Sequence, residues 1–284
     1  MTLQRALINV LDRPGGRGLL GKLASWYIRR QMGQDVQVFF DGTWVRRIGG
    51  AYVADTPDFA YYGNSLAGWG AQLADQAAAT EDFWFHLYRP ASGDVIVDVG
   101  AGSGTDAPVF SRAVGYKGRV LAIEAHPVTF ARLELTCKHN RLSNITCVHR
   151  AVMGRPGQVV IEDGPQDISN AVGAVASPGG VRVAADTLDE ICRQCGIEHI
   201  DLLKMNIEGA ERWAIAGMQH IIRRTRYACI ACHDFRGEAG AAMCTRQAAI
   251  DFLRGHDFQI TTRDPDPRAF VRDHVHGANT RWKQ

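Results

Sequence analysis

The chain has 284 residues, of which 46% are hydrophobic and 22% charged, and its formal net charge is +2. This length and balance are typical of an α/β protein with a large core, and so small a net charge predicts neither nucleic-acid nor membrane binding. No apolar run approaches the ~20 residues that span a bilayer and no signal-peptide core stands at the start, so we expect a cytoplasmic protein without a transmembrane segment.

Residues 1–92 lack the strand–helix alternation that begins near residue 93. The first thirty residues hold six basic side chains against one acid, and apolar residues recur there at helical spacing on both sides of a Pro-Gly-Gly break. We predict a helical arm that packs on the rest of the chain, on a second subunit in a homo-oligomer, or on a membrane surface. Next, VQVFFDGTWVRRIGG predicts a hairpin turning at Asp41 and Gly42. The aromatic, glycine-rich stretch 55–70 predicts a lid, a substrate-facing loop or a packed surface loop.

From residue 93 onward, strand-like and helix-like runs alternate. Strands are expected at 95–99, 119–124, 145–149, 181–186, 200–207 and 227–234, and helices at about 105–114, 127–141 and 244–254 and from residues 187 and 210. Residues 153–180 read as irregular, and the runs FQITTRD and AFVRDHVHG read as a closing hairpin around Asp-Pro-Asp-Pro. This order predicts one domain over 93–284, with a doubly wound, mostly parallel α/β sheet and an antiparallel C-terminal hairpin.

The seven cysteines are an odd number and favour reduced thiols over disulfides. Two Cys-x-x-Cys pairs, Cys192/Cys195 and Cys229/Cys232, could in principle supply four thiolates to zinc. The first pair falls in a helix-like run, and the second in a strand-like run where side chains three apart face opposite sides. The sequence therefore favours buried thiols, and we predict no metal site.

The stretch VIVDVGAGSGTD, residues 95–106, indicates a nucleoside cofactor. An apolar strand containing Asp98 opens onto Gly100, Gly102 and Gly104, where the missing Cβ lets the backbone lie against a ligand. The following helix directs its free N–H groups at the same place. Glu124 ends the next apolar run, where a carboxylate would grip the ribose hydroxyls.

The spacing of this loop indicates which nucleoside is bound. It differs from the dinucleotide pattern G-x-G-x-x-G, and no lysine follows as in a phosphate-binding Walker loop. The acid before the loop, Asp98, suits a cofactor with a cationic amino-acid end and suits a pyrophosphate poorly. We therefore expect S-adenosylmethionine, with a nicotinamide-dependent oxidoreductase as the weaker alternative.

Several runs occur in an order that resembles the FkbM-type S-adenosylmethionine-dependent methyltransferases: IVDVGAGSGTDAPVF, AIEAHPVTFARLELTCKHN, DTLDEI, DLLKMNIEGAE and CHDF. The resemblance covers about residues 93–260, and DLLKMNIEGAE is its most specific part. It implies a class I, Rossmann-like fold with a seven-stranded sheet, and methyl transfer to a hydroxyl of a sugar, glycan or natural product. The chain departs from the family in two places, with Asn206 where an aspartate is usual and Cys232 before His233.

These patterns give a set of expected cofactor-binding residues around the glycine loop and the neighbouring strand ends. Arg150 and Ala151 are expected near the adenine, as the equivalent strand end is in the family, and Asp98 is expected to hold the loop or the amino group. The full set is Asp98, Gly100, Ala101, Gly102, Gly104, Glu124, Ala125, Arg150, Ala151 and Asn206.

Three residues are candidates for the chemistry of the acceptor. His233 ends a predicted strand on the crevice side, and its intrinsic pKa of about 6.5 suits proton removal, although a structural histidine is equally compatible with that position. Asn206 could bind the methionine end or a substrate hydroxyl, and Glu208 lies on the crevice side or serves as a partner of a helix N-terminus. With Asp234 these residues could hold Mg²⁺, but histidine is a poor magnesium ligand and one acid is missing, so a metal is not favoured.

The expected partner is a small-molecule or saccharide acceptor. Two alternatives stay open, a non-catalytic module that binds S-adenosylmethionine and a tRNA or rRNA methyltransferase. The second is disfavoured because the predicted catalytic domain lacks a basic stripe with interleaved aromatic residues.

Overall fold

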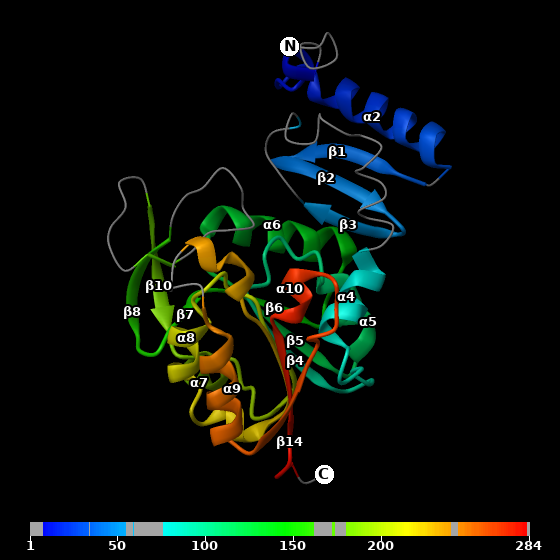
Figure 1. The fold of residues 1–284 in the computed structure, drawn as a ribbon. Helices are drawn as coiled ribbons and strands as arrows, with labels where there is room; N and C mark the ends of the chain where they lie inside the picture. The colour runs from blue at the N-terminus through cyan, green and yellow to red at the C-terminus, as the bar shows by residue number, and fades with distance from the viewer. Residues whose placement is uncertain are drawn as a thin grey trace.

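The structure is a computed structural model, and it describes residues 8–33, 35–54, 59, 76–161, 172–173, 180–239 and 244–282. Its centre is a seven-stranded sheet with the strand order β13-β14-β12-β11-β4-β5-β6 (Figure 1). The strands are β4 (Val95–Val99), β5 (Arg119–Glu124), β6 (Ile145–His149), β11 (Ile200–Met205), β12 (Thr225–Ala231), β13 (Phe258–Thr262) and β14 (His274–Asn279).

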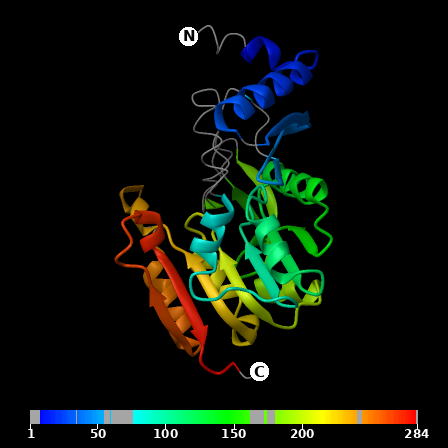
Figure 2. The ribbon, with the colours of Figure 1, turned by 90° about the vertical axis from the view of Figure 1, so that its right-hand side faces the viewer.

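The predicted doubly wound, mostly parallel sheet is confirmed. Neighbouring strands from β6 to β12 pair in parallel, whereas β14 is antiparallel to both β12 and β13. Figure 2 shows the orange and red C-terminal strands at one edge of the sheet. The chain order reverses between β4 and β11, and ligands of such sheets bind at the carboxyl ends of the strands beside that reversal.

Helices cover both faces of the central sheet, and every residue of β4 and β11 is therefore buried. The helices on one face are α4 (Gln76–Trp84) and α5 (Ala107–Val114), and those on the other are α7 (Leu188–Gln194), α8 (Glu211–Ala214) and α9 (Arg246–Gly255). Helix α6 (Pro127–Asn140) follows β5. The predicted helices are present, although the one expected from residue 210 has only four residues.

Local sequence explains where these helices begin. Pro108 and Pro127 stand in the first turns of α5 and α6, where the missing N–H is not needed. Thr187 caps α7, because its side chain accepts a hydrogen bond from the backbone N–H of Glu190. One prediction at the C-terminus is wrong: the first part of AFVRDHVHG forms the short helix α10 (Ala269–Arg272), and only the part from His274 joins the hairpin.

The section predicted as irregular holds part of a second sheet. Strands β7 (Ala151–Val152), β8 (Gly157–Ile161), β9 (Val172–Gly173) and β10 (Val181–Asp186) form a four-stranded sheet in the order β7-β10-β8-β9. The run 181–186 therefore lies outside the central sheet. Its alternating exposed and buried residues fit a sheet with one solvated face, unlike the fully buried β4 and β11.

The N-terminal region forms a three-stranded antiparallel sheet under a helix. The predicted hairpin is confirmed by β1 (Gln37–Asp41) and β2 (Thr43–Ile48), which turn at Gly42, while β3 (Ala51–Ala54) was not anticipated. The helical arm is present as α2 (Arg17–Met32), which buries one face on this sheet.

The N-terminal sheet is attached to α6 by side chain–backbone hydrogen bonds. The Asn140 side chain accepts from the Tyr52 N–H at 2.8 Å and donates to the Tyr52 carbonyl at 2.6 Å, and the Thr136 hydroxyl accepts from the Ala54 N–H at 2.9 Å. The boundary at residues 92 and 93 stays a prediction, and α4 packs with α5 from the N-terminal side of it. The predicted lid, 55–70, lies outside the described residues apart from Phe59. Within the part of the chain that is described, no helix is long and apolar enough to cross a bilayer.

Candidate active site

A cavity of about 400 Å³ opens at the carboxyl ends of β4, β5 and β11, beside the reversal of strand order. All of the predicted cofactor residues except Asp98 and Gly104 line it. They are Gly100, Ala101, Gly102, Glu124, Ala125, Arg150, Ala151 and Asn206.

The floor of the cavity is the glycine loop after β4. At Gly100, where φ is 78°, a Cβ would lie 1.9 Å from the backbone oxygen of Asn206. The N–H of Asn206 in turn donates to the Val99 carbonyl at 2.9 Å. The loops after β4 and β11 therefore touch through their backbones, and only glycine fits at position 100.

Gly104 has a packing role and does not line the cavity. A Cβ at this position would meet Leu133 at 2.8 Å and Thr136 at 3.2 Å, both on α6. The contact between the cofactor and the Gly104 backbone stays a prediction. The glycine lets α6 approach the loop, as a third glycine does in other nucleotide-binding turns.

Glu124 lies at the tip of β5 and is held by two backbone donors. One carboxylate oxygen accepts from the Gly102 N–H at 2.9 Å, and the other accepts from the His126 N–H at 2.8 Å. Burial raises the pKa of Glu124, against these two hydrogen bonds. Because a carboxylate offers about four acceptor positions, Glu124 can still bind hydroxyl groups in the cavity without losing its hold on the loop.

Asp98 lies beneath the loop, in an ion pair with Lys204 of β11. The Lys204 Nζ lies 2.6 Å from the Asp98 Oδ1 and donates to the Gly100 carbonyl at 2.7 Å. Burial acts to lower the pKa of Lys204, but the carboxylates of Asp98 and Asp106 raise it further, so the ammonium stays charged. Of its two predicted roles, Asp98 is placed to hold the loop.

Helix α4 packs against the Asp98–Lys204 pair and the end of the glycine loop. The Trp84 ring centroid lies 5.1 Å from the Lys204 Nζ, and the Trp84 indole N–H donates to Asp106 at 3.0 Å. The Thr80 hydroxyl donates to the other oxygen of Asp106 at 2.5 Å. Residues of α4 thus bind both the lysine under the loop and the acid at its end.

His233 lies outside the cavity lining, between two glutamates. Its Nε2 is 3.4 Å from Glu208 and its Nδ1 is 3.3 Å from Glu211. Burial lowers the pKa of His233, but the two carboxylates raise it more, to about 9. A protonated imidazole cannot accept a proton, so the prediction that His233 acts as the base at neutral pH is not supported.

Glu208 and Asn206 do line the cavity. Glu208 has a left-handed backbone with φ of 55°, a strained conformation for a residue with a Cβ, and Arg236 donates to its carboxylate at 2.6 Å. The side-chain oxygen of Asn206 is buried and accepts no hydrogen bond from the described residues. It is therefore available to a bound amine or hydroxyl.

The sequence was also compared with known proteins. The family profile of the methyltransferase FkbM domain matches residues 98–260, which is more than half of the chain. The chain belongs to the FkbM methyltransferase family. The resemblance to FkbM methyltransferases seen in the sequence runs is thereby confirmed at the level of the family.

Two curated relatives match parts of this FkbM protein. The 2-O-methyltransferase NoeI of Sinorhizobium fredii is 28% identical over 152 residues, covering 47% of this chain and 60% of the relative. The ribosomal RNA large subunit methyltransferase E of Halorhodospira halophila is 33% identical over 118 residues, covering 39% and 53%. The chain thus spans little more than half the length of either relative.

Among solved structures, the methyltransferase FkbM of Methylobacillus flagellatus aligns with a TM-score of 0.45 and 16% identity. The alignment covers 77% of this chain and 60% of that one. A likeness at this level does not bear on function.

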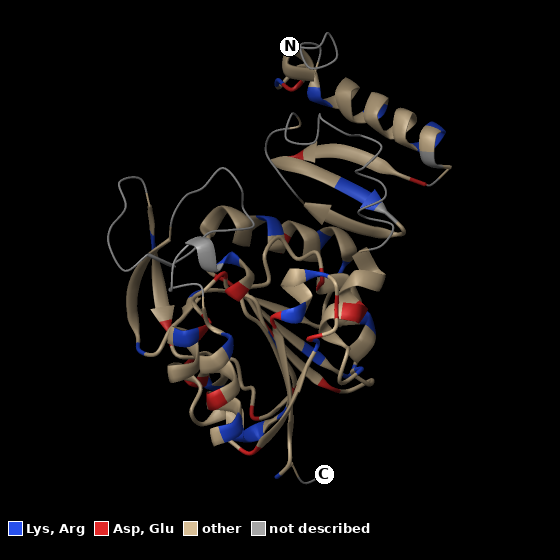
Figure 3. Ribbon diagram, viewed as in Figure 1, with Lys and Arg blue, Asp and Glu red and all other residues tan. Residues whose placement is uncertain are grey.

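Several residues that line the cavity of the FkbM protein are not predicted by the sequence. Arg46 comes from β2 (Figure 3 shows the basic segment of this strand), Gln76 from α4, and His126 and Arg132 from the beginning and middle of α6. Arg46 and Arg132 are both buried. Nothing in the sequence near the glycine loop points to Arg46, because it comes from the N-terminal sheet.

Among the residues that the structure describes, the metal sets considered from the sequence do not come together as clusters of ligands. Cys192 and Cys195 belong to α7 and its end, whereas Cys229 and Cys232 belong to β12 and the residue after it. Asp234 accepts from the N–H groups of Thr245 and Arg246 at 2.9 Å each, and so faces the start of α9 instead of the cavity.

Proposed function

We propose that this FkbM protein transfers the methyl group of S-adenosylmethionine to a hydroxyl of a saccharide or related natural product. The observation that carries the proposal is Glu124, held by the Gly102 and His126 amides and exposed to a cavity over the glycine loop. The activity of the relative NoeI, 2-O-methylation, supports a hydroxyl acceptor.

The lining fits the donor in its chemistry as well as its position. Glu124 would accept hydrogen bonds from the ribose hydroxyls, and the backbone at Gly100 and Gly102 would lie against the adenosine. Arg150 and Ala151 stand past the end of β6, on the side proposed for the adenine. The unpaired oxygen of Asn206 would accept from the amino group of the methionine part.

When bound, S-adenosylmethionine supplies an electrophilic methyl group, so the protein mainly has to align the acceptor and exclude water. Glu208 is a carboxylate of the lining that belongs to the loop after β11, and His233 and Arg236 hold it in place. We assign Glu208 to the acceptor hydroxyl, as a hydrogen-bond acceptor that orients it. Arg46 and Arg132 supply donors of the kind that sugar oxygens accept.

The direct test incubates the full chain with methyl-labelled S-adenosylmethionine and a panel of mono- and oligosaccharides with free hydroxyls. Mass spectrometry should find a product heavier by one methyl group, and the label should survive conditions that cleave esters. Binding of S-adenosylhomocysteine without label in any hydroxylated acceptor would refute the proposed activity and favour the non-catalytic alternative. Transfer to RNA and to none of the saccharides would refute the acceptor class.

A further inference from the structure

Three side chains with metal-binding atoms share one face of the central sheet, away from the cavity. In the antiparallel pair β12–β14, Cys229 lies opposite His276, and His274 lies two residues before His276. Because alternate residues of a strand point to the same face, all three side chains project toward α4. There the Trp84 ring stacks on His274 at 5.1 Å, and the Cys229 Sγ lies 3.8 Å from the Phe83 carbonyl.

The three potential ligand atoms converge in a buried place. One atom from each of Cys229, His274 and His276 lies within 4.8 Å of the others, and the residues are 0%, 3% and 1% exposed. The Nδ1 of His274 and the Nε2 of His276 are buried without a hydrogen-bond partner among the described residues. Buried nitrogens are seldom left in this state, because each has lost its contacts with water.

The three side chains form a donor set of the kind that binds zinc. Imidazole nitrogens and a cysteine sulfur are the ligands that structural zinc sites use, and they coordinate as neutral imidazole and thiolate.

We propose that Cys229, His274 and His276 bind a zinc ion. Zinc favours a thiolate with imidazoles in tetrahedral geometry, and bonds of about 2.0–2.3 Å place such ligand atoms about 3.3–3.8 Å apart, so the cluster would contract slightly around the ion. A further donor is His86, whose ring centroid lies 5.1 Å from that of His276. His86 is exposed, so it offers both a fourth ligand and a route to solvent.

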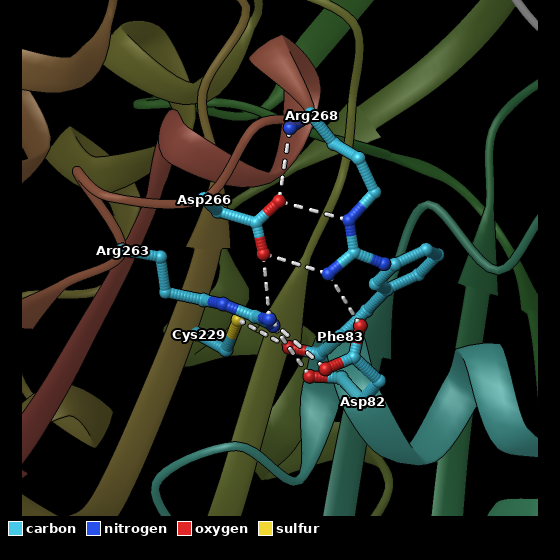
Figure 4. A network of polar contacts seen from close by, with 6 residues as sticks. All are labelled: Asp82, Phe83, Cys229, Arg263, Asp266 and Arg268. Atoms are coloured by element: carbon cyan, nitrogen blue, oxygen red, sulfur yellow. Dashed lines mark hydrogen bonds and ion pairs between the residues drawn. The ribbon is translucent and has the colours of Figure 1, made fainter.

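The charges around the cluster are compatible with an added cation. Figure 4 shows Arg263 and Arg268 bound to the carboxylates of Asp82 and Asp266, next to Cys229. Lys204 of β11 is the register partner of Cys229 on β12, and its charge is neutralised by Asp98. Because a cysteine coordinates zinc as a thiolate, binding would release the Cys229 proton to solvent and leave one net positive charge at the site.

A zinc ion here would bridge β12 and β14 and, with His86 as fourth ligand, would also hold the segment that follows α4. Trp84 joins the two sites, because its ring stacks on His274 and also lies over Lys204 beneath the glycine loop. The ion would thus fix the wall behind the donor cavity without touching the reactants.

The test uses the full chain expressed with added zinc and passed over a gel-filtration column with a mild chelator. Elemental analysis by mass spectrometry should find about one zinc per chain, and growth with cobalt should give a thiolate-to-cobalt charge-transfer band. The variants Cys229→Ser and His276→Gln should both lose the metal and the band. Cys192→Ser removes a thiol that is equally buried but lies in α7, and it should keep both.

Binding of S-adenosylhomocysteine serves as the check that each variant is folded. Wild-type protein with far less than one zinc per chain and no cobalt band would overturn the proposal. Equal metal content in folded Cys229→Ser and Cys192→Ser would also overturn it. His276→Gln keeps the test decisive if Cys229→Ser does not fold.

Discussion

The Nζ of Lys204 lies 2.6 Å from the Oδ1 of Asp98, and each side chain is 2% exposed. The two residues are register partners on the parallel strands β11 and β4. The lysine also donates to the Gly100 carbonyl. One buried ion pair therefore joins the two central strands and fixes the first residue of the glycine loop.

Replacing Lys204 with Met should destabilise the protein by about 3–5 kcal/mol, because the Asp98 carboxylate is left buried without its partner. Urea unfolding followed by circular dichroism measures this. Lys117→Met, at an exposed lysine, should change the free energy of unfolding by less than about 0.5 kcal/mol. The double variant Asp98→Asn with Lys204→Met should recover part of the loss, and equal losses at Lys204 and Lys117 would contradict the buried pair.

Two glycines of the same loop should respond differently to substitution. Gly100→Ala places a Cβ 1.9 Å from the Asn206 oxygen, whereas a Cβ at Gly102 meets nothing within 4 Å. Both positions have positive φ, which costs a non-glycine residue about 1–2 kcal/mol. We expect Gly102→Ala to lose about that much and Gly100→Ala distinctly more. Thermal unfolding of both variants side by side decides the point, and equal losses would show that the loop moves freely away from β11.

Glu124→Ala should weaken binding of S-adenosylhomocysteine by about 10- to 100-fold, since hydrogen bonds to a charged group are worth about 1.5–3 kcal/mol. Glu124→Gln should lose less, because one oxygen can still accept. Isothermal titration calorimetry measures both, with Glu134→Ala on the exposed side of α6 as the control. Unchanged affinity in Glu124→Ala would show that the methyl donor does not bind in this cavity.

His233 should make stability depend on pH in a defined window. Its pKa in the folded protein is raised from 6.5 to about 9, so its stabilising effect is complete below pH 6.5 and is lost as the pH rises through 9. The full difference is at most about 3.4 kcal/mol at 1.36 kcal/mol per pKa unit. Urea unfolding between pH 6 and 9.5 should show this decline in the wild type and a flatter line in His233→Gln. Parallel lines would mean that the histidine is not held charged by Glu208 and Glu211.

The sequence predicts the central sheet and the donor side because the signals are local. The runs VIVDV and IDLLKM are apolar enough to be strands buried on both faces, and Glu124 follows the glycines at the spacing of the next strand. The sequence does not predict the residue roles that depend on contacts between distant segments. Lys204 gains its role from its register opposite Asp98, and the charge of His233 comes from Glu208 in the loop after β11 and Glu211 at the start of α8. The short strands β7, β8 and β9 are missed because Gly, Pro and Ser recur through this section, whereas the run that forms β10 is predicted as a strand.

Substitution of Arg46 tests whether the N-terminal sheet contributes to the active site. Arg46 lines the cavity, whereas its neighbour Arg47 pairs with Asp35, because successive side chains of a strand face opposite sides. Arg46→Met keeps the apolar stem and removes the guanidinium, so we expect the KM for donor or acceptor to rise several-fold or more, while Arg47→Met leaves it unchanged. Steady-state methyl transfer with each reactant varied in turn will show which of the two Arg46 contacts. If both variants match the wild type in both KM values, then the N-terminal sheet supports the fold without taking part in binding.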